Sequence, residues 1–327
     1  MPIILTRKDL RALLTMEEII QALEGAFLSY SRGETVAPVR LAMEVKPHKG
    51  ICLLMPSFQE HPGGLGVKVV SVFPENLRKD LPTIFSYYLF CNPETGALLA
   101  LMDGAMLTGL RTGGASGLAS RYLGKKDSKA LGIFGAGVQA GFQLEAMKVV
   151  FPMLKEVYVF DADKSRTAEF IKNLPKDPKI EVKAAASSDQ VVENSDVIVT
   201  ATTSRTPVFS GKLLKPGTHI NAIGGFTPAM QELDEETIVK SKLVVDTYEG
   251  CLSEAGELLI PMEKGVFSKE KIHSDLAGLV SGKKPGRENP QEITLFKSVG
   301  TAIEDLAAAR LAYQKAMERG IGLSFEI

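Results

Sequence analysis

The stretch Lys129-Ala-Leu-Gly-Ile-Phe-Gly-Ala-Gly-Val-Gln-Ala-Gly-Phe-Gln143 decides the fold of this chain. Its apolar run predicts a buried strand, the glycines predict a turn, and the residues that follow favour a helix from Val138. Gly135, Gly137 and Ala140 fill the pattern G-x-G-x-x-A, which lets a dinucleotide pyrophosphate approach the backbone. The phosphates would lie on the amides at the helix start, where the helix dipole favours negative charge. Taken alone, such a turn also occurs in folds that bind no nucleotide.

The chain around this turn alternates short strands with helices. After Asp127, β-branched apolar runs predict strands at 131–134, 157–160, 180–182, 197–201, 219–223 and 243–245. Helices are expected from Val138 and around 165–174. This alternation is typical of a Rossmann-type α/β fold, a doubly wound parallel sheet with helices on both faces. The context favours a dinucleotide site at the glycine turn.

Asp161 follows the second of these strands, 26 residues after Gly135. At this place the motif expects an acid that binds the adenine ribose hydroxyls, and a carboxylate there would repel a 2′-phosphate. NAD(H) is therefore the preferred cofactor. Lys164 and Arg166 follow closely and keep NADP(H) possible. The alternative is that Asp161 caps the next helix.

The first hundred residues follow a different pattern. Thr15-Met-Glu-Glu18 predicts a capped amphipathic helix that ends near Gly33. β-rich runs follow at 41–45, 51–55, 66–73 and 83–92, and Asn92-Pro-Glu-Thr-Gly96 is a hairpin-type turn, so we expect an antiparallel or mixed sheet. Small side chains crowd the predicted helix at 112–119, where a neighbouring helix or a ligand must approach closely. An alanine-rich helix at 301–317 is expected to return to this first domain.

The composition points to small-molecule partners. The chain has 327 residues, a formal net charge of −1 and no long run of lysine and arginine, so we expect no nucleic-acid or membrane partner. Cys52, Cys91 and Cys251 are few and far apart, which favours a reducing cytoplasm. We expect no export signal and no membrane span. No metal-ligand spacing occurs among His, Cys, Asp and Glu, so no metal site is predicted.

Two cationic side chains occur in otherwise apolar or small-residue surroundings. Lys68 alternates with Val70 and Val72 in a predicted strand, which indicates a half-buried ammonium that needs a partner such as a substrate carboxylate. The alternative is a lysine that protects an edge strand. Arg111 lies in a predicted helix, where the alternative is an ordinary interhelical salt bridge. Arg40 is a weaker third candidate.

Six separated strings, in order along nearly the whole chain, resemble the ornithine cyclodeaminase and mu-crystallin family, which includes archaeal-type alanine dehydrogenases and ketimine reductases. The strings are Gly66-Val-Lys-Val-Val-Ser-Val-Phe-Pro74, Asn92-Pro-Glu-Thr-Gly96, Leu107-Thr-Gly-Leu-Arg-Thr-Gly-Gly114, Phe134-Gly-Ala-Gly-Val-Gln139, His219-Ile-Asn-Ala-Ile-Gly-Gly225 and Ser298-Val-Gly-Thr-Ala302. The resemblance implies an NAD-binding Rossmann domain at 121–298. It also implies an α+β domain at 1–120 and 299–327 that binds substrate and forms a homodimer.

The resemblance also assigns roles to residues. Arg40, Lys68 and Arg111 are expected on the substrate carboxylate, with Lys68 and Arg111 as the catalytic pair, and Met55 and Thr83 match pocket positions. Together with the glycine turn and Asp161, the predicted cofactor-binding residues are Thr112, Gly135, Ala136, Gly137, Val138, Gln139, Asp161, Arg166, Thr202, Ile223, Gly224 and Ser298.

One departure from the family pattern concerns the reaction. Cyclodeaminases resemble Gly-Gly-Asp-x-Pro-Gly-Lys after the fifth strand, and their aspartate acts on the substrate amine. Here the string is Gly224-Gly-Phe-Thr-Pro-Ala-Met230, and the phenyl ring of Phe226 cannot accept a proton. Archaeal-type alanine dehydrogenases carry the aspartate as well.

Members without this aspartate resemble reducers of cyclic imines. The resemblance therefore implies NADH-dependent reduction of Δ1-pyrroline-2-carboxylate to L-proline, or of Δ1-piperideine-2-carboxylate to L-pipecolate, with Phe226 as an aromatic wall. The alternatives are an alanine dehydrogenase, an ornithine or lysine cyclodeaminase, and a nucleotide-dependent binding protein without catalysis.

Overall fold

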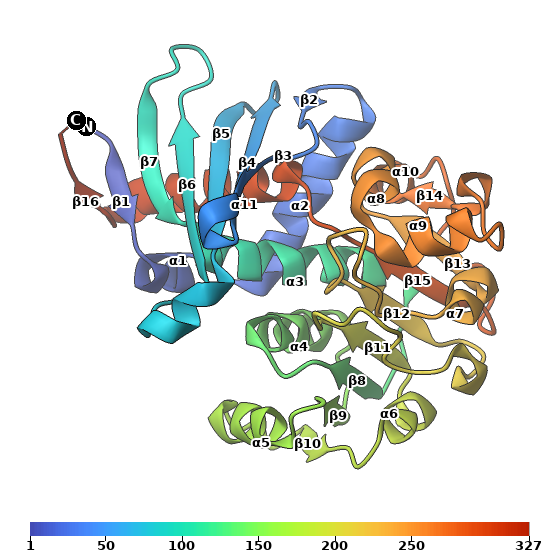
Figure 1. Cartoon of the computed structure of the whole chain (residues 1–327). Coiled ribbons are helices and arrows are strands. Elements are labelled where there is room, and N and C mark those ends of the chain that lie inside the picture. Colours follow the sequence, from blue (N-terminus) through green and yellow to red (C-terminus); the bar gives the residue numbers. More distant parts are fainter. Residues whose placement is uncertain (327) are drawn as a thin grey trace. The chain divides into compact units, whose positions relative to one another are not determined.

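The computed structural model describes residues 1–326, which form two compact units. The first unit contains Met1–Arg111 and the chain from Thr301 onward, and the second unit contains Thr112–Gly300. Figure 1 labels the elements of both. This division and the predicted boundary after residue 120 both lie within helix α3 (Gly104–Leu123).

The first unit is built on a mixed eight-stranded sheet. Its strand order is β16-β1-β7-β6-β5-β4-β2, and β3 pairs with β4. The strands are β1 (Ile3–Leu5), β2 (Thr35–Val36), β3 (Leu41–Val45), β4 (Gly50–Gln59), β5 (Gly64–Val72), β6 (Ile84–Cys91), β7 (Leu98–Asp103) and β16 (Leu323–Ser324). Among residues 1–326, β1 and β7 are the only strands of this sheet that pair in parallel. The predicted hairpin turn is confirmed, because the Asn92 side chain accepts hydrogen bonds from the amides of Glu94 and Thr95 between β6 and β7.

Helices cover one face of this sheet. They are α1 (Arg7–Leu13), α2 (Met16–Ser31) and α11 (Ala302–Arg319). The predicted capping box is confirmed, since the Thr15 hydroxyl and the Glu18 carboxylate each accept a hydrogen bond from the other residue's amide. Helix α11 packs on α2 and on strands β4, β5 and β6, as Figure 1 shows. The C-terminal helix thus returns to the first unit, as predicted.

The second unit is built on a wholly parallel sheet of eight strands. Its order is β10-β9-β8-β11-β12-β15-β13-β14. The strands are β8 (Ala130–Phe134), β9 (Glu156–Phe160), β10 (Glu181–Ala184), β11 (Val197–Thr200), β12 (His219–Ala222), β13 (Ser241–Val245), β14 (Ser274–Asp275) and β15 (Ile293–Lys297). The predicted Rossmann-type doubly wound sheet is confirmed, although β14 and β15 were not predicted.

The helices of the second unit connect these strands. They are α4 (Val138–Val150), α5 (Lys164–Asn173), α6 (Ser188–Asn194), α7 (Glu235–Lys240), α8 (Tyr248–Glu254), α9 (Gly256–Glu263) and α10 (Leu276–Val280). After β8 the chain adds β9 and β10 on one side, and then returns to place β11 and β12 on the other side. The switch point therefore lies between β8 and β11, and ligands of such sheets bind at the carboxyl ends of these strands. Among the described residues, no helix is both long and apolar enough to cross a membrane.

Candidate active site

The glycine turn after β8 has the geometry of an anion site. Gly135 has a φ of 93°, and a Cβ added there would lie 2.7 Å from the carbonyl oxygen of Ala201, just after β11. Only glycine fits this turn. Gly137 caps α4 without a side-chain hydrogen bond, and Val138 is 82% exposed. The first amides of α4 are therefore open to a phosphate.

Asp161 lies against this turn. Its Oδ2 accepts a hydrogen bond from the amide of Ala136 at 2.9 Å, and its Oδ1 accepts one from the amide of Asp163. The cap of α5 is Asp163, so Asp161 does not serve as the helix cap that was its alternative. Arg166 is exposed on α5, 3.9 Å from the carboxylate of Asp163. The carboxylate of Asp161 thus stands beside the glycine turn, where the motif expects the ribose.

Three predicted cofactor residues lie at the ends of β11 and β12, and two of them, Thr202 and Gly224, bind Glu232. Thr202 donates its amide and hydroxyl hydrogens to Glu232 Oε1, at 2.6 and 2.7 Å. Gly224 donates its amide to Glu232 Oε2 at 2.8 Å. Ile223 continues the ladder by donating to the carbonyl of Thr200. One buried carboxylate therefore joins the ends of two neighbouring strands.

The remaining predicted cofactor residues are more scattered within the second unit. Ser298 follows β15, and its buried hydroxyl donates to Asp246 Oδ2 at 2.8 Å. Thr112 is buried in α3. Gln139 lies in the first turn of α4, and its Oε1 is buried with no hydrogen-bond partner. An orphaned acceptor beside the glycine turn fits a ligand that brings a donor.

In the first unit, Lys68 lies in a buried ion pair. Its ammonium is 2.7 Å from Asp305 Oδ2 and donates to Asp305 Oδ1 at 2.9 Å. Strand β5 runs between β4 and β6, and Lys68 is in register with Met55 and Tyr88, both buried on the same face. Lys68 is only 2% exposed, so the prediction of a half-buried lysine was wrong. The interior position of β5 also excludes an edge-strand role.

Arg111 shares the same acid. Its Nε donates to Asp305 Oδ1 at 3.1 Å, and its Nη1 donates to Glu304 at 2.5 Å. An interhelical salt bridge between α3 and α11 is therefore present, and it includes Lys68. We call Lys68, Arg111, Glu304 and Asp305 the ionic cluster. Buried cations are stable only with such partners.

The electrostatics of the ionic cluster extend to Arg40. Burial, followed by the nearby charge of Arg111, lowers the pKa of Lys68 to about 8, while Asp305 acts in the opposite direction. Arg40 also lowers the pKa of Lys68, which places it within electrostatic range of the ammonium. Within the ionic cluster two carboxylates face two cations, and Arg40 is a third cation whose charge reaches Lys68.

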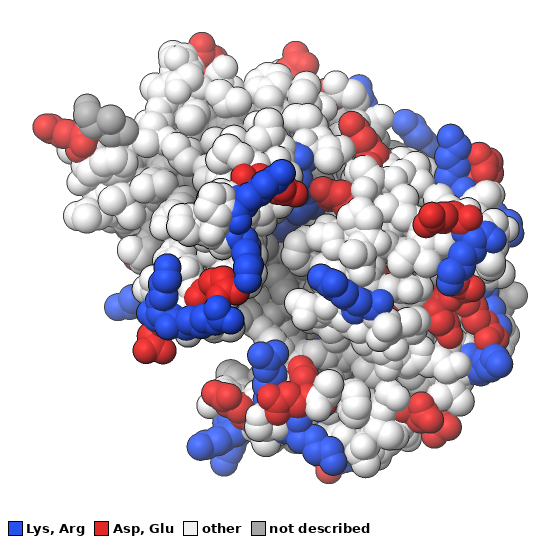
Figure 2. Space-filling model, in the orientation of Figure 1, with Lys and Arg blue, Asp and Glu red and all other residues white. Residues whose placement is uncertain are grey.

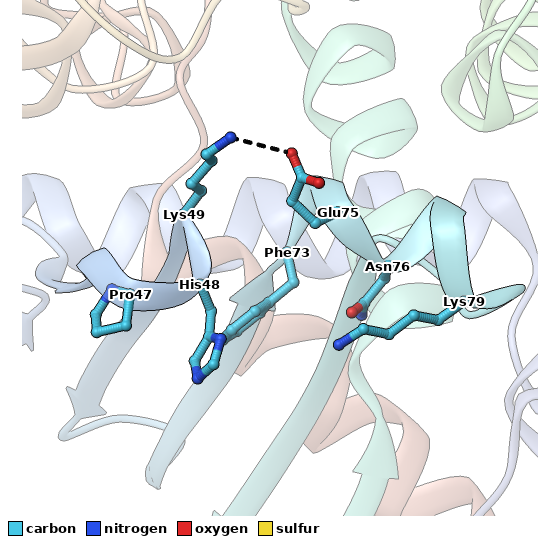
Figure 3. A pocket seen from close by; sticks show the side chains of 7 residues that line it. All are labelled: Pro47, His48, Lys49, Phe73, Glu75, Asn76 and Lys79. Carbon is cyan, nitrogen blue, oxygen red and sulfur yellow. Dashed lines mark hydrogen bonds and ion pairs between the residues drawn. The ribbon is translucent and has the colours of Figure 1, made fainter.

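No recorded contact joins the predicted substrate residues Thr83 and Phe226 to the ionic cluster within the described residues. Thr83 precedes β6, and its carbonyl accepts a hydrogen bond from the amide of Phe73 at 2.7 Å. Phe226 lies in the loop after β12 and is 39% exposed. A surface pocket of about 440 Å³ in the first unit includes none of the predicted site residues (Figure 3). It is lined by Pro47, His48, Lys49, Phe73, Glu75, Asn76 and Lys79.

The comparison with known families is unambiguous. The model of the ornithine cyclodeaminase/mu-crystallin family matches residues 1–320. The chain belongs to this family. Within the described residues, no group of three or more His, Cys, Asp and Glu side chains could hold a metal ion.

Individual family members are similar over their whole length. The chain is 37% identical, over 99% of both proteins, to Delta(1)-pyrroline-2-carboxylate reductase of Bacillus thuringiensis. It is 47% identical, with a TM-score of 0.95, to the Thermococcus litoralis reductase of the same name solved with NADH and L-proline. That match covers 99% of this chain and 100% of the other. An archaeal alanine dehydrogenase dimer with bound NAD is 37% identical, with a TM-score of 0.92 and 99% coverage of both chains.

Sequence reasoning missed the acids of both sites. Glu304 and Asp305 occupy the first turn of α11, where acids are ordinary because of the helix dipole. The available signal is that apolar residues flank this acidic pair on both sides. Glu232 lies in a loop, and no sequence motif around it indicates a functional role. Its role depends on contacts that only the fold brings together.

Proposed function

We propose that this member of the ornithine cyclodeaminase/mu-crystallin family catalyses the NADH-dependent reduction of a cyclic imino acid. Δ1-Pyrroline-2-carboxylate is the first candidate, giving L-proline, and Δ1-piperideine-2-carboxylate is the second. The observation that carries this proposal is the ionic cluster, in which shared acids fix two buried cations, Lys68 and Arg111, within electrostatic range of Arg40. The similar Thermococcus litoralis reductase, solved with NADH and L-proline, supports it.

The substrate carboxylate is bound by cations of the first unit. Lys68 and Arg111 share Asp305, which fixes the direction of both side chains before a ligand arrives. Such preorganisation lowers the entropic cost of binding and positions the reacting atoms. Arg40 is the third cation proposed for the substrate carboxylate, and its charge reaches Lys68. Met55 and Thr83 complete the proposed substrate set.

The dinucleotide is held by the second unit. Its pyrophosphate belongs on the turn at Gly135 and the first amides of α4, and its adenine ribose belongs at Asp161. The fit rests on the open helix start and on the orphaned Gln139 Oε1. NAD(H) is preferred because Asp161 repels a 2′-phosphate, and Lys164 and Arg166 nearby allow a weaker use of NADP(H).

Reduction of the imine converts C2=N to CH–NH, which takes one hydride and one proton. The bound cofactor supplies the hydride to C2. A cyclic imine can bind with its nitrogen already protonated at neutral pH, and in that form the reaction needs no dedicated acid. Lys68 has a pKa of about 8 and stays charged under these conditions, which keeps the carboxylate in place. Positioning by Lys68 and Arg111 therefore supplies much of the acceleration.

The decisive experiment follows NADH oxidation with each candidate substrate. We expect rapid oxidation with Δ1-pyrroline-2-carboxylate and little with pyruvate plus ammonia, since Phe226 offers no carboxylate to handle a free amine. Oxidation with pyruvate and ammonia alone would identify an alanine dehydrogenase. Ammonia release from ornithine or lysine would identify a cyclodeaminase. If no imine and no oxo acid causes NADH oxidation, the result would favour a nucleotide-dependent binding protein without catalysis.

We also propose a homodimer formed through the open face of the first unit's sheet, opposite α11. Apolar side chains form a continuous row across this face, because Leu41, Leu54, Val69 and Tyr87 are in register on β3 to β6. Tyr87 is 49% exposed. In Figure 2 the surface over the upper part of this sheet is mostly uncharged, whereas blue and red side chains lie toward its lower end. An exposed apolar sheet face is typical of an interface, and a second copy supplies the matching face.

The proposed location is the cytoplasm. Cys52, Cys91 and Cys251 are all free thiols. Free thiols are kept reduced in that compartment.

A further inference from the structure

Glu232 accepts hydrogen bonds from five donors. Oε1 binds the amide and hydroxyl of Thr202. Oε2 binds the hydroxyl of Thr200 at 2.9 Å and the amides of Gly224 at 2.8 Å and Gly225 at 3.2 Å. Glu232 is completely buried, and none of these donors belongs to a neighbouring residue in the chain. Hydrogen bonds from this many donors hold a buried carboxylate and its donor segments in one arrangement.

A second charged pair, Lys297 and Glu257, binds the Gly224–Gly225 segment through a backbone carbonyl. Lys297, at the end of β15, donates from its ammonium to the carbonyl of Gly225 at 2.6 Å. Glu257, in α9, lies 3.1 Å from that ammonium and accepts a hydrogen bond from the amide of Glu232. All three charged side chains are fully buried. Both amides and one carbonyl of the Gly224–Gly225 turn are thus engaged.

The two segments joined by Glu232 border the switch point of the sheet. Thr202 follows β11, which pairs with β8, and Gly224 follows β12 on the other side of β11. The glycine turn after β8 touches the same region, because Gly135 lies against Ala201. The Thr202 hydroxyl donates its hydrogen to Glu232 and accepts a hydrogen bond from the Ser204 amide at 3.2 Å, so one acceptor lone pair is left for a ligand. The hydroxyl can therefore accept a hydrogen bond from a ligand but cannot donate one.

We propose that Glu232 is a positioning residue for the dinucleotide, which sets the loops after β11 and β12 at the spacing that the cofactor requires. This inference rests on the proposed function for the identity of the ligand. It adds that Thr202 presents an acceptor to a ligand N–H or O–H. Glu232 itself touches only protein groups and acts through Thr202 and Gly224.

The position demands a carboxylate rather than an amide. Each oxygen of Glu232 accepts from at least one backbone amide, Thr202 on one side and Gly224 with Gly225 on the other. In Glu232→Gln, either orientation of the carboxamide turns its NH₂ group toward a backbone N–H that cannot rotate away. One of the two loops must then move. Glu232→Asp keeps the charge, but its shorter side chain cannot reach both loops.

The test compares the two Glu232 variants with Asp234→Ala. Asp234 lies two residues away, and its hydrogen bonds go to Gly211 and Thr237. Its loss removes the cap of α7 and lowers stability without releasing the two loops. NADH affinity is measured by fluorescence titration without imine, and Tm is measured with and without NADH. A purely structural role lowers Tm in both states equally and leaves the NADH-induced increase in Tm unchanged.

For Glu232→Gln we expect a Kd for NADH raised by about tenfold or more, and a smaller NADH-induced increase in Tm. Asp234→Ala should lower Tm and retain the wild-type Kd. A folded Gln variant with the wild-type Kd overturns the proposal. If the Gln variant does not fold, Glu232→Asp decides, with an expected rise of about threefold or more and an unchanged Kd as the contrary result. A wild-type protein that binds NADH but reduces no cyclic imine refutes the proposed function alone.

Discussion

The ammonium of Lys68 and the carboxylate of Asp305 form a buried ion pair with a separation of 2.7 Å, between residues 237 positions apart in the chain. Burial and Arg111 lower the pKa of Lys68, and Asp305 opposes both effects. The acid therefore keeps a buried lysine charged at neutral pH. A binding site for a carboxylate needs that charge, so the pair connects the architecture of the first unit with its proposed chemistry.

Replacement of Lys68 by methionine removes the charge and keeps the bulk of the side chain. Since a charge-assisted hydrogen bond contributes about 1.5 to 3 kcal/mol, we expect kcat/KM for Δ1-pyrroline-2-carboxylate to fall by about tenfold or more. Steady-state kinetics with NADH measures this change. Lys46→Met is the control, because the Lys46 side chain is 84% exposed and pairs only loosely with Glu44. An unaltered kcat/KM in the Lys68 variant would remove this lysine from the substrate site.

The affinity for a planar ring carboxylate should depend on pH through Lys68. Pyrrole-2-carboxylate is a suitable probe, because it has no basic nitrogen of its own. The charged lysine binds the carboxylate, so affinity should be full below a pH of about 8 and should decline as the pH rises through that value and the ammonium loses its proton. Titration calorimetry with the NADH-bound protein measures the curve. Constant affinity up to a pH of about 10, near the ordinary pKa of lysine, contradicts the assignment.

Asp305→Asn should shift that curve to lower pH. Asp305 raises the pKa of Lys68 by its charge and its hydrogen bond, and asparagine retains the size but not the charge. The buried ammonium then loses its proton more easily, and the midpoint for pyrrole-2-carboxylate binding falls below that of the wild type. Gln21→Asn, at an exposed position of α2, is the control and should leave the midpoint of the binding curve unchanged. A midpoint equal to that of the wild type would show that Asp305 does not control Lys68.

Asp161→Ser should change the choice of cofactor. Loss of the carboxylate removes the repulsion of a 2′-phosphate, so the ratio of kcat/KM for NADPH to that for NADH should rise by about tenfold or more. Asp163→Ser is a matched control, because Asp163 is two residues away and caps α5, and serine is an equally good cap. The ribose-reading role fails if both variants keep the wild-type ratio.

Tyr87→Lys should disrupt the proposed dimer. Tyr87 is half-exposed in the single chain, so lysine there leaves the fold of the unit intact while it places a charge in the centre of the apolar row. Light scattering after size-exclusion chromatography should give the mass of one chain for the variant and of two chains for the wild type. Val239→Lys, at an exposed position of α7, should behave as the wild type. If the Tyr87→Lys variant is still a dimer, the dimer interface does not include this sheet face.

The sequence predicted the fold well where local patterns decide it. The glycine turn, the strand and helix alternation, the capping box at Thr15 and the hairpin at Asn92 all appear as expected. Strand β15 escaped prediction because its short apolar run, Ile293–Lys297, ends in a lysine. Its place between β12 and β13 is set by the sheet as a whole rather than by its own residues.

The candidate site was predictable only on its cationic side. Lys68 and Arg111 are conspicuous in the sequence because they interrupt apolar or small-residue segments. Their acidic partners resemble ordinary charges at a helix start, and nothing local indicates that α11 turns this face toward β5. The degree of burial of Lys68 was underestimated for the same reason, since the covering helix is remote in the chain. Glu232 and Lys297 required the assembled sheet in the same way.

The position of Asp305 in the last long helix also constrains how the protein is made. Lys68 leaves the ribosome 237 residues before its partner. Before α11 is synthesised, Lys68 and Arg111 have no Asp305 to pair with. A buried cation without an acidic partner is not stable in an apolar interior. Completion of the first unit and assembly of the proposed substrate site therefore both depend on α11. A product of interrupted translation or proteolysis that lacks this helix lacks both acids of the ionic cluster.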